Sequence, residues 1–460
     1  SSCCGPCVGC CVFFRLFRRE RKTRDDAVLA TVRELALGTH PASVLDIRSL
    51  LLAHSSGRSI RKSYRVDGPL GGGSFGRVFH VTHLRTGEER AVKRIPLSHV
   101  QVDMKYVYSE LEALVSLDHP NIVKFFEFFE EADMLHVVTE LCSGGNFKLL
   151  NHGINDMAEI RLLFRDLVMA VAHCHDRGIS HRDLKFENCL LQKEPGMRRV
   201  TKVIDFGFAS IRRPGDEIDH WSTEQLGSKY FVAPEVIIAG RGKMYGVACD
   251  CWAIGVLLYI VLTDAHPCVD SVSGLDTHKM FRAISKGRVR EVPLDVCDVD
   301  PLARDLIRKL LVRKPELRLN AQEALQHPWF KLAEGCSGWN LADNSIWNLA
   351  FYTRQNSIDE CMLSGITSFA THSRFQRAML TLVAHHASSR DVENLRAAFD
   401  LLDTSKTGSL SKDEFRNVYE TLNVKGDIDS VFDSLDADNT GKIRYTEWLP
   451  PPPAPSAPVS

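Results

Sequence analysis

Two short segments, HRDLKFEN at 181–188 and DFG at 205–207, constrain the fold of this 460-residue chain more than any other feature. Asp183 and Asn188 lie five residues apart with a lysine between them, and Asp205 precedes a glycine that frees the backbone. Carboxylate and amide oxygens are the hard ligands that Mg²⁺ prefers. We therefore expect a fold that brings both segments together around a metal-bound phosphate.

A glycine-rich stretch lies upstream, between two runs with the composition of β-strands. Gly71, Gly73 and Gly76 form the pattern G-x-G-x-x-G, and Val78 follows it. Glycines let backbone N–H groups approach phosphate oxygens, although a plain glycine-rich turn explains this motif alone equally well. The motif does not open a helix, which argues against a dinucleotide-binding fold.

Lys93 lies in another strand-like run, AVKRI, seventeen residues after Gly76. A lone lysine in a strand is usually solvated at a sheet edge. Here apolar neighbours predict that the side chain crosses a sheet, and a buried ammonium needs anionic partners. We expect ATP phosphates and the carboxylate of Glu110 to be those partners.

These motifs, followed by Ala-Pro-Glu at 233–235, together resemble a eukaryotic-type protein kinase. Lys185, two residues after Asp183, is typical of the serine/threonine class. The resemblance implies a two-lobed α+β protein-kinase fold over residues 64–330. Strand-like runs dominate its first part, and helical periodicity extends from Gly144 to about Phe330. The chemistry implied is transfer of the γ-phosphate of Mg·ATP to protein Ser/Thr hydroxyls.

The resemblance also implies roles for individual residues. Asp183 would accept the proton of the substrate hydroxyl, Lys185 would steady the γ-phosphate, and Lys93 would hold the α/β-phosphates while pairing with Glu110. Asn188 and Asp205 would bind Mg²⁺. The nucleotide-binding residues would be Gly71, Gly73, Gly76, Val78, Ala91, Lys93, Glu140 and Cys142.

Two further contacts carried over from the resemblance would support the large lobe. Glu235 would pair with Arg318, and Asp250 would brace the catalytic loop. Many kinases have a glutamate at the position of Asn146, which helps to bind a basic substrate residue. The substitution puts a strong preference for arginine in doubt, although Glu187 remains.

Two twelve-residue segments, 403–414 and 436–447, have EF-hand spacing and stand thirty-three residues apart. Oxygen-bearing side chains occupy loop positions 1, 3, 5 and 12, a glycine occupies position 6, and position 7 offers its backbone carbonyl. We expect Leu410 and Ile443 to pair between the loops. The expected Ca²⁺ ligands are Asp403, Ser405, Thr407, Ser409, Glu414, Asp436, Asp438, Thr440, Lys442 and Glu447.

A kinase followed by EF-hands resembles the calcium-dependent protein kinases of plants and protists. The resemblance implies a junction/autoinhibitory segment at 331–389 and an EF-hand pair at 390–449. Phe375, Met379 and Leu382 fall on one helical face of that junction, which core packing would also explain. Two alternatives are a calcium-binding scaffold with an inactive kinase fold and a constitutively active kinase with non-regulatory EF-hands.

Two departures from that family affect the expected regulation. The junction has few basic residues, with Arg374 and Arg377 remaining, so we expect leaky autoinhibition. Pro450 to Pro453 follow Glu447 within one turn and block the exiting helix, so we expect a weakened second hand. Residues 450–460 are rich in proline and are expected to be disordered.

The N-terminal tail at 1–63 contains five cysteines in its first eleven residues, next to aromatic and basic residues. This composition suits acylation combined with a basic patch, although an unmodified tail or a weak zinc site fits nearly as well. Scattered single cysteines elsewhere suit a reducing compartment. We expect a cytoplasmic monomer with membrane association as an option, and a net charge of −1 gives no drive towards nucleic acid.

Overall fold

A computed structural model describes the two kinase lobes and part of the EF-hand region. The expected N-terminal tail, junction segment and proline-rich tail lie outside the described residues, apart from residues 59–63 and 331. The described residues are 59–73, 76–97, 104–131, 133–152, 156–193, 198–212, 228–239, 245–270, 276–331, 399, 402–405, 407–421, 428–436 and 440–445.

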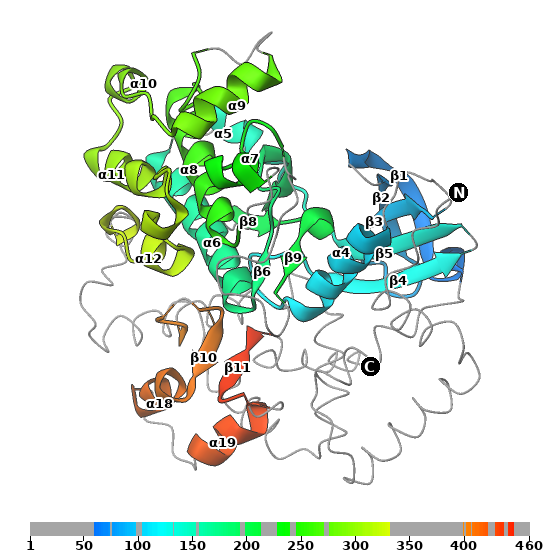
Figure 1. Ribbon diagram of the computed structural model, residues 1–460. Coiled ribbons are helices and arrows are strands. Elements are labelled where there is room, and N and C mark those ends of the chain that lie inside the picture. The colour runs from blue at the N-terminus through cyan, green and yellow to red at the C-terminus, as the bar shows by residue number, and fades with distance from the viewer. Residues whose placement is uncertain are drawn as a thin grey trace, which may run out of the picture.

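Five antiparallel strands form the small lobe in the order β1-β2-β3-β5-β4, with helix α4 (Met104–Ser116) beside them (Figure 1). One strand, β4, was not among the runs singled out in the sequence. The strands are Tyr64–Gly73 (β1), Gly76–His83 (β2), Glu89–Pro96 (β3), Phe125–Glu131 (β4) and Met134–Glu140 (β5).

The two faces of this sheet have separate cores. Val92 packs with Phe126 and Val138 on one face. Ile95 belongs to the other core, which includes Val107 of α4 and continues into the large lobe. Side chains two residues apart on a strand point to the same face. Lys93 therefore lies on the face of Ile95, towards α4 and the large lobe.

Eight α-helices form most of the described large lobe (Figure 1). Helix α8 is buried continuously from Cys249 to Tyr259, which explains why its sequence is apolar on all sides. The helices are Lys148–His152 (α5), Met157–Asp176 (α6), Pro234–Ala239 (α7), Ala248–Thr263 (α8), Thr277–Lys286 (α9), Val292–Val296 (α10), Pro301–Leu310 (α11) and Ala321–Leu325 (α12).

The described large lobe is mainly helical, as the sequence predicted, and four short strands and three 3-10 turns lie between its helices. Strand β6 pairs with β9, and β7 pairs with β8, in two separate ladders. Strands of two to four residues are too short to show alternation against a helical background. The bounds are Ile179–Ser180 (β6), Phe186–Asn188 (η3), Cys189–Gln192 (β7), Val200–Val203 (β8), Phe206–Phe208 (η4), Ser210–Ile211 (β9) and Pro315–Leu317 (η5).

In the EF-hand region, a two-stranded ladder joins the loops. Strand β10 (Ser409–Ser411) pairs with β11 (Lys442–Arg444), with Leu410 opposite Ile443, which confirms that predicted pair. Helices α18 (Lys412–Thr421) and α19 (Ile428–Leu435) lie between the two strands in the sequence, and edge-on ring contacts join Phe415 to Phe432 and Phe399 to Tyr445.

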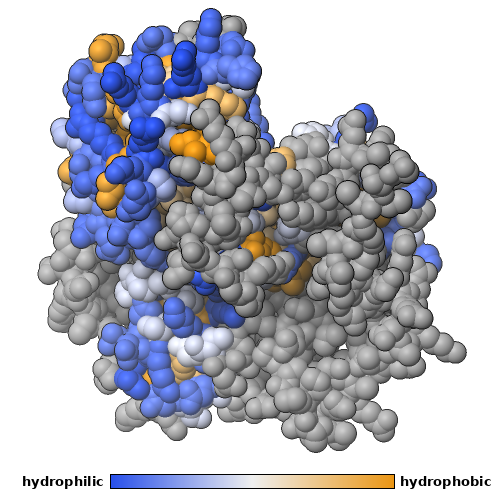
Figure 2. Space-filling model, viewed as in Figure 1, coloured by the Kyte–Doolittle hydropathy of each residue, from blue (hydrophilic) through white to orange (hydrophobic). Residues whose placement is uncertain are grey.

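The described surface is mainly polar on the face drawn in Figure 2, with hydrophobic residues in small groups over the large lobe. Among the described helices, none combines the length and the apolar character that crossing a membrane requires. The described cysteines are free thiols.

Candidate active site and calcium loops

Lys93 joins two carboxylates that are distant in the sequence. Its Nζ donates to Oε1 and Oε2 of Glu110 at 2.7 and 2.9 Å and to Oδ1 of Asp205 at 2.7 Å. The lysine side chain is 13% exposed and Glu110 is 4% exposed. Burial alone would lower the pKa of Lys93, but the two carboxylates outweigh it and raise that pKa. The predicted pair with Glu110 is confirmed, and β3, α4 and the DFG segment are locked together.

The glycine-rich motif forms the turn between β1 and β2. Residues 74–75 at its tip lie outside the described residues. A Cβ on Gly76 would lie 2.1 Å from the carbonyl oxygen of Arg94, whereas a Cβ on Gly71 would meet nothing within 4 Å. Gly76 therefore lets β2 and β3 approach each other, a packing role that the phosphate interpretation did not foresee. Val78 lies opposite Lys93 in the same ladder.

The catalytic loop concentrates hydrogen bonds on Asp183, which is 2% exposed. Its Oδ2 accepts from Nζ of Lys185 at 2.5 Å and from Nδ2 of Asn188 at 3.2 Å. Its Oδ1 accepts from the backbone N and the Oγ of Ser228 at 2.9 and 2.8 Å. The structure thus brings together the three predicted residues of this loop and adds Ser228, which the sequence analysis did not single out.

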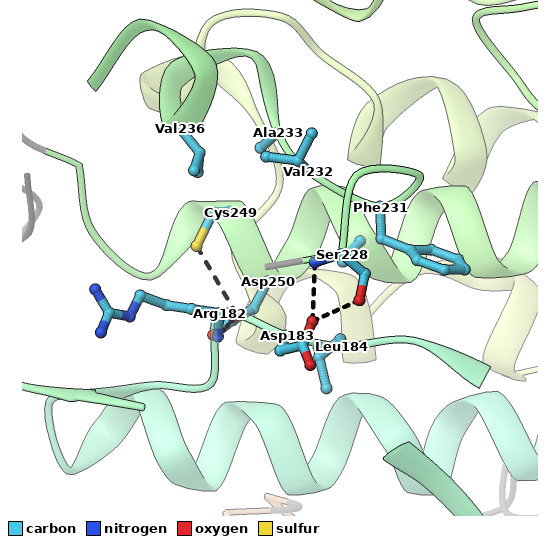
Figure 3. Close-up of a pocket in the computed structure, with 11 residues that line it drawn as sticks. Arg182, Asp183, Leu184, Ser228, Phe231, Val232, Ala233, Val236, Cys249 and Asp250 are labelled. Atoms are coloured by element: carbon cyan, nitrogen blue, oxygen red, sulfur yellow. Dashed lines mark hydrogen bonds between the residues drawn. The ribbon is translucent and has the colours of Figure 1, made fainter. Parts of the chain in front are cut away.

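A small pocket lies beside Asp183, between the catalytic loop, α7 and α8 (Figure 3). Ser228 and Phe231 line it from the segment that precedes α7, and Cys249 and Asp250 line it from α8. In Figure 3 both bonds from Ser228 point to the same carboxylate oxygen of Asp183. The segment before α7 therefore fixes the orientation of the catalytic carboxylate.

Asp250 supports the catalytic loop from the buried helix α8, as predicted. Its carboxylate accepts the backbone N–H groups of His181 and Arg182 at 2.9 and 2.8 Å and the hydroxyl of Ser180 at 3.0 Å. Nε2 of His175 lies 2.9 Å away. Burial would raise the pKa of Asp250, but these partners outweigh it and lower that pKa. Asp250 therefore stays ionised.

The DFG segment turns sharply at Asp205, whose φ of 63° lies in the left-handed region. Phe206 is fully buried, and its ring lies 4.9 Å from that of His181. Burial would raise the pKa of Asp205, but the contact with Lys93 outweighs it and lowers that pKa. The turn directs an ionised carboxylate towards the lobe interface.

The donor set around Asp205 and Asn188 suits Mg²⁺. The Nδ2 of Asn188 donates to the backbone oxygen of Asp183 at 2.8 Å, so its amide oxygen is the atom that remains for a metal. One carboxylate and one amide oxygen are hard ligands, and Mg²⁺ in such sites takes its other ligands from phosphate and water. The residues present fit the metal that was expected.

The segment predicted to meet adenine follows β5. The side chain of Glu140 is 6% exposed and accepts from Nζ of Lys202 and from the backbone N of Lys124, both at 2.7 Å. Its side chain is thus engaged within the protein, and its backbone N–H donates to the carbonyl oxygen of Lys124 at 2.9 Å. Burial raises the pKa of the Cys142 thiol, so Cys142 is a neutral group. Thr139 and Ala91 lie opposite each other in the β3–β5 ladder.

Glu235 and Arg318 form the predicted ion pair. Nη1 and Nη2 of Arg318 donate to the two carboxylate oxygens at 2.6 and 2.9 Å, and the arginine side chain is fully buried. Arg318 also donates to the backbone oxygens of Ala248 and Val312. This pair fixes α7, and with it the segment that carries Ser228, to the rest of the large lobe.

The first calcium loop gathers its expected ligands around Asp403, which is 1% exposed. Asp403 accepts from Oγ of Ser405 at 3.3 Å, from N of Thr407 at 2.9 Å and from N of Gly408 at 2.6 Å. The hydroxyl of Thr407 donates to the carbonyl oxygen of Ser409 at 3.0 Å. The side-chain atoms that meet in this loop, from Asp403, Ser405 and Thr407, are oxygens, which fits Ca²⁺.

Glu414 closes this loop at position 12. Its Oε1 accepts from the backbone N of Ser405 at 2.8 Å, and its Oε2 accepts from the backbone N of Ser411 at 2.9 Å. Burial would raise the pKa of Glu414, but these hydrogen bonds outweigh it and lower that pKa. An ionised carboxylate at this position suits a bidentate calcium ligand.

The second loop is described in part. Asp436 accepts from the backbone N–H groups of Thr440 and Gly441 at 2.9 and 2.7 Å, and the hydroxyl of Thr440 donates to the carbonyl oxygen of Lys442 at 3.2 Å. Asp438 and Glu447 lie outside the described residues. The part described has the same arrangement as the first loop.

The fold and the site together define a protein kinase followed by an EF-hand pair. Comparison with protein families agrees, because residues 64–330 match the protein kinase domain and residues 392–449 match the EF-hand domain pair. Protein kinase domains use ATP and Mg²⁺, and EF-hands bind Ca²⁺.

Curated relatives give a narrower assignment. Calcium-dependent protein kinase 24 of Oryza sativa subsp. japonica is 30% identical over 83% of this chain and 68% of its own length. Calcium-dependent protein kinase 25 of Arabidopsis thaliana is 29% identical over 91% of this chain and 78% of its own. Calcium-dependent protein kinase 3 of Plasmodium yoelii yoelii is 28% identical over 83% of this chain, which spans 66% of that relative. The chain belongs to the calcium-dependent protein kinase family.

Proposed function

We propose that this protein transfers the γ-phosphoryl group of ATP to serine and threonine hydroxyls of other proteins. The observation that carries the proposal is the joining of Lys93 to Glu110 and Asp205, residues 17 and 112 positions away, at 2.7 Å each. An inactive scaffold has no need for three buried charges held in one place, because burying charges costs free energy.

The residues act mainly by positioning and by charge. Lys93 and Lys185 hold the phosphates through their ammonium groups. As the substrate oxygen bonds to the γ-phosphorus and the bond to ADP breaks, the carboxylate of Asp183 takes the hydroxyl proton. Ser228, Lys185 and Asn188 orient that carboxylate through the hydrogen bonds described above. Mg²⁺, when bound by Asn188 and Asp205, neutralises charge on the phosphates.

An activity assay on the full chain tests this proposal. We expect phosphate incorporation into serine and threonine peptides but not into a tyrosine peptide. Asp183→Asn should lower the rate at least about 10²-fold, because a general base contributes about 10² to 10⁴. Asp270→Asn is the control, because the Asp270 side chain is 93% exposed. Equal rates for the two variants would contradict the role of Asp183.

Calcium regulates this transfer, in line with the family, by occupying the loops at 403–414 and 436–447. The first loop is the stronger candidate, since the prolines at 450–453 block the helix that leaves the second loop. Titration calorimetry on the full chain tests this point. Glu414→Gln should weaken one site at least about tenfold, while Asp413→Asn, whose side chain is 90% exposed, should not.

The N-terminal cysteine cluster gives this cytoplasmic kinase a reversible membrane anchor through acylation. Two signals, acyl chains and the adjacent basic residues, together hold a protein at a membrane. Membrane sedimentation of the protein from cells should be lost when Cys3, Cys4, Cys7, Cys10 and Cys11 are all replaced by serine. Undiminished sedimentation of that variant would rule out the anchor.

A further inference from the structure

The first calcium loop contacts the large lobe of the kinase domain near the C-terminal end of α6. Figure 1 shows β10 and β11 below this helix. The carbonyl oxygen of Thr407 lies 3.4 Å from Nδ1 of His173, a residue 234 positions earlier. His173 has no exposed surface, and Gly408, next to Thr407, is buried as well. The contact therefore excludes solvent on both sides.

Gly408 leaves no room for a side chain at this contact. A Cβ on it would lie 2.3 Å from Cδ2 of His119 and 2.8 Å from Nδ1 of His173. Real Cβ atoms essentially never approach other heavy atoms this closely. The backbone of the loop thus packs directly against two imidazole rings, which we call the histidine pair.

The histidine pair is a rigid surface of the kinase domain. The two ring centroids lie 4.8 Å apart. The Nδ1 of His119 accepts from the backbone N of Asn121 at 3.0 Å, and the Nδ1 of His173 lies 3.1 Å from Nη1 of Arg177. Both side chains are at least 96% buried, since His119 is 4% exposed and His173 is 0% exposed. Turning either ring aside to admit a methyl group would break these contacts.

The second calcium loop provides an internal comparison. Gly441 has the same loop position as Gly408 and nearly the same φ, 76° against 73°. A Cβ on Gly441 would meet nothing within 4 Å. Both glycines therefore serve the bend of their loops, but only Gly408 also serves a contact with another domain.

The first loop presents different faces to calcium and to the kinase domain. The hydroxyl of Thr407 points into the loop, towards the carbonyl oxygen of Ser409, while its own carbonyl oxygen faces His173. Thr407 therefore shapes the calcium site on one side and touches the histidine pair on the other.

Charged groups from both domains lie at the edge of the contact. Burial and the nearby positive charge of Arg444, in β11, lower the pKa of Arg177, and Asp118 acts in the opposite direction. Like charges from the two domains thus lie close together at its edge. Away from that edge, the backbone of the loop packs closely against the two rings.

We infer that the histidine pair, His119 and His173, is a docking site on the kinase domain for the first calcium loop of this chain's own EF-hand pair, with Thr407 and Gly408 as the residues received. The inference deepens the proposed calcium regulation and rests on it, because the loop that docks is the loop that binds the ion.

Hydrogen–deuterium exchange on the full chain in calcium tests the docking site. Gly408→Ala should raise the exchange rate of a peptide covering residues 170–178 about tenfold, because the added methyl group forces the loop off the histidine pair. Gly441→Ala introduces the same backbone strain without the clash and should leave that peptide unchanged. Equal effects of the two variants on residues 170–178 would overturn the inference.

A substitution on the kinase side gives an independent test. His173→Leu should speed exchange of a peptide covering residues 403–411, and His173→Asn, which keeps a polar atom, should have a smaller effect. Exchange of residues 249–259 in α8 serves as the control for a loosened lobe. If α8 and residues 403–411 both keep the wild-type rates in His173→Leu, the docking site is wrong. If exchange in α8 also becomes faster, the lobe itself has been loosened and this variant is not informative. The docking site is then judged from Gly408→Ala and Gly441→Ala, which do not change the sequence of α6.

Failure of docking can be told apart from failure of the proposed function. Calorimetry and peptide phosphorylation report calcium binding and catalysis without reference to the histidine pair. Normal calcium binding and catalysis combined with equal exchange in the two glycine variants would reject docking alone. If the wild-type chain binds no calcium in calorimetry, the calcium regulation on which the docking inference rests is rejected.

Discussion

At the scale of single residues, Lys93 shows how burial and function are linked. An ammonium that is 13% exposed is stable in this sheet because two carboxylates surround it. The motif predicted one of them, Glu110. The third member, Asp205, was predicted as a metal ligand, and its contact with Lys93 emerges only when the lobes are placed together.

Glu110→Gln tests the importance of this arrangement. The amide cannot hold the ammonium as the carboxylate does, so Lys93 should shift towards Asp205. We expect kcat to fall about 10²-fold, because small misplacements of phosphate-binding groups have effects of that size. Glu89→Gln is the control, since Glu89 lies on β3, the strand of Lys93, and its side chain is 64% exposed. Equal kcat values in a steady-state assay would contradict the positioning role.

Lys148 affects the expected choice of substrate. Its Nζ lies 2.6 Å from Oε1 of Glu187, the acidic residue that remains for reading a basic substrate residue. The pair is about half exposed, and such pairs contribute up to about 1 kcal/mol. Lys148→Ala should free Glu187 and lower the KM of peptides with an arginine before the acceptor by up to about fivefold. Peptides without arginine are the control; an equal change in both would exclude this effect.

Asp250 predicts a pH dependence of stability. Its pKa is lower in the folded chain than in the unfolded chain, where 3.8 is the reference. The stabilisation is therefore complete above the unfolded pKa and is lost as pH falls below about 4. Asp250→Asn should lower the Tm at pH 7 by about 5 °C or more, and the difference should shrink towards pH 3. A difference in Tm between wild type and Asp250→Asn that stays constant from pH 7 to pH 3, measured by thermal melting, would contradict this pH dependence.

At the scale of elements, two glycines of the glycine-rich turn differ in their packing. Gly76 lies against β3, whereas Gly71 has open space around it. Gly76→Ala should push β2 away from β3 and destabilise the small lobe by about 1–3 kcal/mol. Gly71→Ala, in the same motif, meets open space and should keep the melting temperature. Thermal melting without nucleotide measures both variants. Similar destabilisation by the two variants would show that the close approach of β2 to β3 at Gly76 does not determine the stability of the small lobe.

Elements were predictable from the sequence to different degrees. The small-lobe strands other than β4 follow from strand-like runs, the helical character of the large lobe follows from helical periodicity, and the Leu410–Ile443 pair follows from loop spacing. The two-residue strands β6 and β9 carry too few residues for any period. Ser228 was missed for another reason: its partner, Asp183, lies 45 positions away, and no local pattern encodes that contact.

At the scale of the whole molecule, the sequence predicted a kinase domain and a calcium-binding pair but not the contact between them. The histidine pair consists of two residues that read as ordinary core histidines, and Gly408 reads as an ordinary loop glycine. Their meeting depends on how the domains pack, which involves sequence separations above 200 residues. The contact between a calcium loop and the kinase domain is thus a property of the tertiary arrangement.

The rate of phosphate transfer to a serine peptide, measured for the full chain across a titration of free calcium, tests the central claim most directly. We expect a low rate in chelator, a saturating rise with calcium, and a flat, near-zero line for Asp183→Asn. A wild-type rate that is zero at every calcium concentration would contradict the kinase, and a rate independent of calcium would contradict its regulation.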